Sequence, residues 1–283
     1  MLFEINHRTH YNYSAPVSLE HMSLQLHPRS DVNQTVRDYR LEVSPAPAGI
    51  SHCVGLDGNS TSTVWFDKLY KNLQIDVYAL VETHPDDPFN FLITDSSALT
   101  LPLKYSAQLE ATLAHYLLNE SHSPALTTFT QGVMQEAKFE TISFLMLLAQ
   151  QIPTRLKYML REHGDPWTPQ ETLENGEGAC RDFSVLFIEA CRLVGIAARF
   201  VSGYCIGNEA DNSHMHAWAE VYLPGAGWRG FDPSRGVTTS EDHISVAAGY
   251  SAQDAAPTNG AYRGVATSSM EADISVSILK QST

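Results

Sequence analysis

The chain has 283 residues, of which 43% are hydrophobic and 18% charged, so it can bury a large core and lacks the composition of a disordered protein. Its formal net charge of −14 would repel phosphate backbones and anionic lipid surfaces, which argues against nucleic-acid and membrane partners. Small molecules, peptides or basic protein surfaces suit this charge better as partners. The composition says nothing about the oligomeric state.

The N-terminal stretch "MLFEINHRTHYNYS" alternates apolar and polar residues and lacks the cationic start and unbroken apolar run of a signal peptide. No segment approaches the roughly 18 consecutive apolar residues that suggest a membrane-spanning helix. We therefore expect a cytoplasmic protein. The four cysteines form no C-x-x-C pair and are expected to be free thiols in a reducing compartment: Cys53, Cys180, Cys191 and Cys205.

The first hundred residues show the period-two alternation of β-strands. One face of three early segments is formed by Phe3, Ile5, Thr9, Tyr11 and Tyr13, by Met22, Leu24 and Leu26, and by Tyr39, Leu41 and Val43. The clearest strand is "LQIDVYALVE", with alternating apolar residues from Leu73 to Val81. Turn sequences at 44–49, 56–60 and 84–88 separate these runs. Short strands divided by turns predict an antiparallel β-sandwich domain over residues 1–97.

The pattern then changes to helical spacing. Leu109, Leu113, Tyr116 and Leu117 share one helical face, and Ser106 is the expected N-cap. A second helix is predicted in "TISFLMLLAQQI", ending at Pro153. We place the domain boundary in this transition, so residues 98–283 form the second domain.

Two cysteines stand in "GEGACRDFSVLFIEACRLVGIAARFVSGY", residues 176–204. After Cys180, the apolar residues fall on one helical stripe, and Gly195 ends the helix. Cys180 is therefore predicted at the helix N-terminus and Cys191 on its buried side. The unpaired N–H groups and the positive dipole end of a helix favour a thiolate, which makes Cys180 the candidate nucleophile.

A nucleophilic thiol needs a base, and the base needs an acceptor that orients it. "HAWAEVYLPGAGWRGFDPS" is predicted to form two strands joined by a glycine-rich turn. If these strands pair antiparallel, His216 at the start of the first lies beside Asp232 at the end of the second. Residues 244–266 show no clean period and are expected to be a loop, and "ADISVSIL" is predicted as a last strand.

These two segments, read together, resemble the core of the transglutaminase-like superfamily over about residues 135–250. The stretch "THYNYSAPVSLEHMSLQLHPRS" is similar to the N-terminal domain that precedes this core in a bacterial subfamily. The resemblance implies an α+β protein, in which the N-terminal antiparallel β-sandwich is followed by a papain-like core whose cysteine-bearing helix packs on an antiparallel sheet.

The resemblance also implies a catalytic triad, with Cys180 as nucleophile, His216 as general base and acid, and Asp232 holding the imidazole. Trp167 is the candidate for stabilising the oxyanion besides the Cys180 backbone N–H. Tyr204 and Trp218 are expected to pack around the site and are candidates for substrate or oxyanion contacts. The implied chemistry is acyl transfer through a thioester on cysteine, with a peptide or protein as the substrate. No cofactor is implied.

Several alternatives stay open at this point. Cys180 could be an inert packed thiol, and Asp232 could serve only the Asp-Pro turn. A zinc site from Cys180, His214 and His216 would lack closely spaced ligand pairs, and we predict no metal. The triad suits a peptidase or amidase, in which water resolves the thioester, and equally a transglutaminase, in which an amine does. A non-catalytic binding protein of the same fold is the third alternative.

Overall fold

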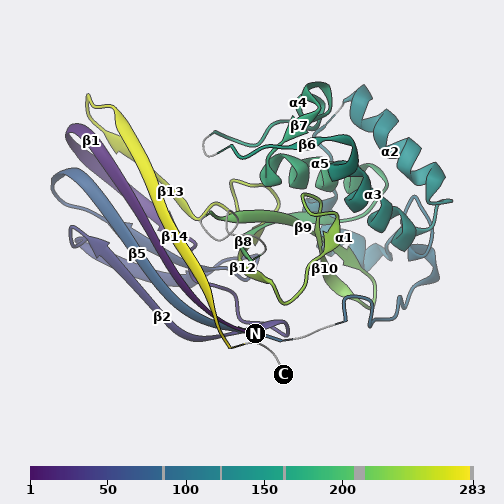
Figure 1. Cartoon of the computed structure of the whole chain (residues 1–283), viewed down its shortest axis with the longest axis horizontal. Coiled ribbons are helices and arrows are strands. Elements are labelled where there is room, and N and C mark those ends of the chain that lie inside the picture. Colours follow the sequence, from purple (N-terminus) through teal and green to yellow (C-terminus); the bar gives the residue numbers. More distant parts are fainter. Residues whose placement is uncertain (85–86, 122, 162–163, 207–213, 281–283) are drawn as a thin grey trace.

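The computed structural model describes residues 1–84, 87–121, 123–161, 164–206 and 214–280. It consists of a long, curled β-sheet and a second, smaller sheet covered by helices (Figure 1). Residues of both parts line a cleft. No helix in these described ranges is long and apolar enough to cross a membrane. The mixed α+β class predicted from the sequence is confirmed.

The curled sheet is antiparallel and has seven strands. Five come from the N-terminal region and two from the C-terminal end of the chain: β1 (Leu2–Leu24), β2 (Gln34–Ser44), β3 (Gly49–Val54), β4 (Ser60–Trp65), β5 (Leu69–Thr83), β13 (Thr258–Arg263) and β14 (Ser268–Lys280). The predicted alternation holds in β5, where Leu73, Ile75, Val77, Ala79 and Val81 are all buried.

Strand β1 runs through both halves of this sheet. Its first half pairs with β5 on one side and β14 on the other, and its second half pairs with β4 and β13. The expected sandwich is therefore one continuous, curled sheet. Strand β1 has 23 residues and is long enough to pair with other strands in both halves of it.

The second part contains a five-stranded antiparallel sheet in the order β11-β10-β9-β8-β12. Its strands are β8 (Ala198–Cys205), β9 (His216–Leu223), β10 (Gly227–Asp232), β11 (Val237–Thr238) and β12 (His243–Gly249). Around it lie a short 3₁₀ helix, five α-helices and a two-stranded sheet: η1 (Ser96–Ala98), α1 (Ala107–Leu117), α2 (Pro124–Glu136), α3 (Thr141–Arg155), α4 (Pro169–Asn175), α5 (Cys180–Leu193), β6 (Lys157–Tyr158) and β7 (Glu177–Gly178).

The helices α1 and α5 begin where the sequence predicted, and Ser106 caps α1 by accepting a hydrogen bond from the Leu109 N–H. Helix α3 continues past Pro153 to Arg155. The sequence did not predict α2 or α4. The expected loop over 244–266 is wrong, because it contains β13 and all of β12 except its first residue, His243. Nearly every residue of β12 is buried, so no apolar alternation marks the strand.

The two parts share a buried apolar contact. Phe3, Ile5 and Ile274 of the curled sheet pack with Tyr204 and Ile244 of the smaller sheet. Strands β13 and β14 hydrogen-bond to β1, although the predicted division counts them with the second domain. The division near residue 97 itself stays a prediction.

Candidate active site

Cys180 is the first residue of helix α5, a 14-residue helix whose buried face packs on β8 and β9. Two residues earlier, Gly178 allows the chain to approach the helix closely, because a Cβ atom there would lie 2.9 Å from the Phe183 ring. As the first residue of the helix, Cys180 lies at the positive end of the helix dipole. The side chain is partly exposed, as a nucleophile needs.

Cys191 lies in the same helix and is fully buried. Burial raises the pKa of its thiol well above the ordinary value, so this cysteine stays protonated and inert. The predicted contrast between the two thiols is confirmed in their placement.

His216 and Asp232 meet as the hairpin predicts. Strands β9 and β10 pair antiparallel, with Phe231 opposite Ala219, so the start of β9 lies beside the end of β10. His216 Nε2 is 2.8 Å from Asp232 Oδ2, and both side chains are buried. Since Nε2 is held by the carboxylate, Nδ1 is the ring nitrogen left for the thiol of Cys180, whose interaction with His216 raises the pKa of that ring.

The electrostatics of this trio favour a charged imidazole. Burial opposes a positive charge, but the hydrogen bonds to Asp232 and Cys180 outweigh it and raise the pKa of His216 to about 10. Burial would likewise raise the pKa of Asp232, yet the hydrogen bonds from His216 and His243 hold it well below its usual range. A charged imidazole beside a cysteine stabilises the thiolate that attacks a carbonyl.

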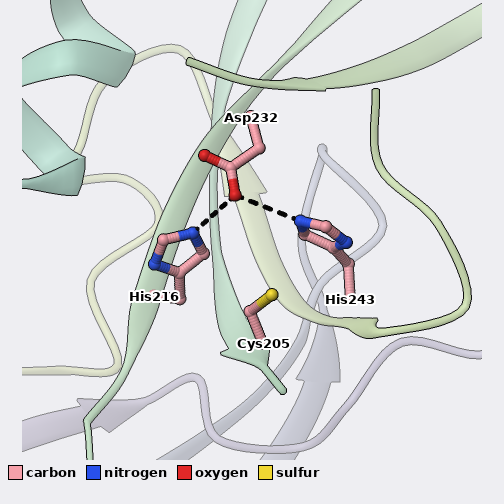
Figure 2. Close-up of side chains that lie close together, drawn as sticks. All are labelled: Cys205, His216, Asp232 and His243. Atoms are coloured by element: carbon pink, nitrogen blue, oxygen red, sulfur yellow. Dashed lines mark hydrogen bonds and ion pairs between the residues drawn. The ribbon is translucent and has the colours of Figure 1, made fainter. Parts of the chain in front are cut away.

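Two further side chains, those of His243 and Cys205, lie near the Asp232 carboxylate (Figure 2). His243 Nε2 lies 3.2 Å from Asp232 Oδ2, and Cys205 sits beside the two histidines. The four residues come from neighbouring strands: Asp232 from β10, His216 from β9, Cys205 from β8 and His243 from β12. His243 is the first residue of β12 and lies beside Asp232, although it is not a member of the predicted triad.

Cys205, His216, Asp232 and His243 could in principle hold a metal ion, since their ligand atoms lie within 4.8 Å of one another. The hydrogen bonds do not fit that use. The Ser240 N–H donates to His243 Nδ1, which leaves the proton of this ring on Nε2, the atom that would have to bind the metal. The Arg235 guanidinium, 2.8 Å from the Cys205 sulfur, would also repel a cation.

Asp182 joins two segments of the chain next to Cys180, which the sequence did not predict. Its fully buried carboxylate accepts hydrogen bonds from the Ala179 N–H at 2.8 Å and the Trp167 N–H at 2.7 Å, and it forms an ion pair with Arg161. It thereby fastens the segment before α4 to the start of α5. The only local signal was an acidic residue in the first turn of the helix.

A cleft of about 540 Å³ opens in front of Cys180 and His216. One wall is formed by Arg161, Gly164, Asp165, Pro166 and Arg181. The opposite wall comes from the curled sheet, where β1 and β14 supply His7, Thr9, Met270, Ala272 and Ile274. The cleft that Cys180 lines therefore has walls from both parts of the molecule.

The three residues proposed for substrate or oxyanion contacts lie around this cleft without lining it. Trp167 stacks under the Arg161 guanidinium, 4.8 Å from the ring centroid. Tyr204 is almost fully buried and bonds His7 Nδ1 at 2.8 Å, and Trp218 is buried against the His243 ring. His214 lines the cleft. The roles of Trp167, Tyr204 and Trp218 stay predictions.

Comparison with known proteins agrees with this geometry. Residues 127–233 match the model of the transglutaminase-like superfamily, and residues 3–82 match that of the bacterial transglutaminase-like N-terminal region. An uncharacterized protein of Mycobacterium leprae is 25% identical over 284 residues, covering 96% of this chain and 97% of its own length. One of Mycobacterium tuberculosis is 29% identical over 274 residues, covering 91% and 86%.

The fold is also found in a crystal structure. A "Putative Cysteine Protease" from Cytophaga hutchinsonii superimposes with a TM-score of 0.75 at 20% identity, covering 100% of this chain and 92% of that one. The two family matches span more than half of the chain and include Cys180, His216 and Asp232. The chain therefore belongs to the transglutaminase-like superfamily, with the N-terminal region of its bacterial branch.

Proposed function

We propose that this protein is a cysteine peptidase or amidase that cleaves its substrate through a thioester on Cys180. The observation that carries the proposal is the arrangement of the triad. The partly exposed thiol begins helix α5, and the histidine beside it is held by a buried carboxylate 2.8 Å away. This is the geometry of nucleophile, base and orienting acceptor that acyl transfer requires.

In the first half-reaction, the Cys180 thiolate attacks the carbonyl carbon of the substrate, and the carbonyl π electrons move onto the oxygen. The backbone N–H of Cys180 is a donor for this oxyanion, because an N–H in the first helical turn has no acceptor inside its own helix. When the intermediate collapses, the C–N bond breaks and imidazolium His216 gives its proton to the leaving nitrogen.

In the second half-reaction, water gives a proton to His216 and attacks the thioester, the C–S bond breaks, and the acid leaves. Hydrolysis is favoured because the thiol is partly exposed in an open cleft that water can enter. The alternative is a protein-glutamine γ-glutamyltransferase, in which a primary amine replaces water. It uses the same three residues.

The test incubates the purified protein with a peptide panel, with and without a labelled primary amine, and follows mass changes. Cys180→Ala is the control. Fragments made by the wild type and not by the variant support hydrolysis, whereas labelled amine on glutamine supports transfer. If wild type and variant behave alike and Cys180 reacts with iodoacetamide no faster than the exposed Cys53, the protein is a non-catalytic member of the fold and both readings fail.

A further inference from the structure

The carboxylate of Asp232 has more partners than a triad needs. Its Oδ1 accepts hydrogen bonds from the Ser234 N–H at 2.9 Å and the Ser234 hydroxyl at 2.6 Å. Its Oδ2 is reached by His216 Nε2 at 2.8 Å and by His243 Nε2 at 3.2 Å (Figure 2). Since Asp232 is fully buried, these contacts decide how the carboxylate is turned.

The hydrogen bonds of His243 identify where its proton lies. A backbone N–H can only donate, and that of Ser240 points at His243 Nδ1 over 3.2 Å. Nδ1 therefore carries a lone pair, and the ring proton is on Nε2. Nε2 in turn donates this proton to Asp232 Oδ2. The contact between His243 and Asp232 is thus a directed hydrogen bond rather than a chance approach of two polar groups.

The position of His243 is also well defined by the fold. It begins strand β12 and pairs with Cys205 of β8. The Trp218 ring packs against the imidazole edge to face, at 5.3 Å between centroids. The side chain is almost fully buried. A buried ring held by backbone pairing, an aromatic neighbour and two hydrogen bonds has little freedom to turn away.

We propose that His243 is a positioning residue of the active site. By donating to Oδ2, it fixes the orientation of the carboxylate. The carboxylate in turn orients the His216 ring, with Nε2 toward Asp232 and Nδ1 toward Cys180. The inference rests on the proposed function for its kinetic consequence. It extends the triad to a chain of four side chains, Cys180, His216, Asp232 and His243, anchored at its end by the Ser240 backbone.

Two substitutions test this role. His243→Leu removes the donor at similar size, and His243→Gln keeps an N–H near the place of Nε2. We expect His243→Leu to lower kcat for a cleaved peptide about 10- to 100-fold with KM nearly unchanged, the range seen when an outer partner of an oriented histidine is removed. His243→Gln should recover most of that loss. His21→Leu, at an exposed histidine of β1, is the matched control.

A second readout does not depend on peptide cleavage. The rate of Cys180 alkylation by iodoacetamide, followed by peptide mapping from pH 5 to 10, should fall and change its pH profile in His243→Leu and recover in His243→Gln. The other charged and titratable groups near Asp232 remain in every variant: His216, Cys205, Arg235 and Asp242. If His243 only supported the fold, His243→Leu would lower the folded fraction and leave the pH profile of Cys180 alkylation unchanged.

A third measurement uses the unaltered protein. Nitrogen-15 NMR of the histidine rings should show the His243 proton on Nε2, so the assignment stands or falls even if His243→Leu does not fold. A proton on Nδ1, or wild-type alkylation and turnover in His243→Leu, would overturn the proposal. If the wild type cleaves no peptide, the proposed function fails, while the alkylation and NMR results still decide the role of His243.

Discussion

His216 Nε2 lies 2.8 Å from Asp232 Oδ2 in a place from which solvent is excluded. Asp232→Asn keeps the shape of this pair but replaces the charge and permits the wrong imidazole tautomer. We expect kcat to fall by about 10⁴, as for the equivalent change in a serine protease triad. Steady-state kinetics on a cleaved peptide measure the effect, with Asp67→Asn, at an exposed aspartate, as control. A loss below tenfold would contradict the assigned role.

The charge on His216 should appear in the pH dependence of stability. Its pKa rises from 6.5 to about 10 on folding, so the charged ring stabilises the folded state fully below pH 6.5, and this contribution is lost as the pH rises through 10. The Tm difference between wild type and His216→Gln should therefore shrink from pH 6 to pH 10. A difference that grows over this range would show that His216 is neutral.

The two cysteines of helix α5 should differ sharply. Cys180→Ala should abolish cleavage, because Cys205, which also lies near His216, is buried and accepts a hydrogen bond from Arg235. Cys191→Ala should retain cleavage within a few-fold and lose about 1 kcal/mol of stability, since it removes one buried sulfur from the core. Peptide assays and urea unfolding measure the two effects. An inactive but folded Cys191→Ala would show that the buried thiol is needed after all.

Asp182 should be important for stability. Asp182→Ala leaves Arg161 without its carboxylate and the Ala179 and Trp167 N–H groups without their acceptor. We expect a loss of about 3 to 5 kcal/mol in the free energy of unfolding, the cost of breaking a buried pair. Glu174→Ala, at an exposed residue of α4, should change it by less than about 0.5 kcal/mol. Equal effects of the two substitutions on urea unfolding would refute this.

The curled sheet should influence substrate binding, because Ala272 of β14 lines the cleft that contains Cys180. Ala272→Trp narrows the cleft on the wall formed by the curled sheet, which does not carry the triad, so we expect KM for a long peptide to rise several-fold while alkylation of Cys180 by iodoacetamide is unchanged. Ser275→Trp, at an exposed position of the same strand, is the control. If both variants bind peptides as the wild type does, the substrate does not use this wall.

Local patterns predicted the elements that carry the triad. Helix α5 shows an apolar stripe and a glycine at its end, and the β9–β10 hairpin shows alternation on both sides of a glycine-rich turn. Helix α2 escaped detection because threonines and Gly132 interrupt its apolar spacing. Strand β12 escaped because a strand buried on both faces has no alternating pattern.

The amino-acid sequence by itself therefore determined the helix start at Cys180, the burial of Cys191 and the meeting of His216 with Asp232, since each depends on one element or one hairpin. Only the tertiary structure decided that β14 returns to pair with β1, that the curled sheet walls the cleft, and that His243 donates to Asp232. These contacts join segments that are distant in the chain or lie on strands that are not neighbours. These contacts depend on packing across the whole fold, which a local pattern of apolar residues does not indicate.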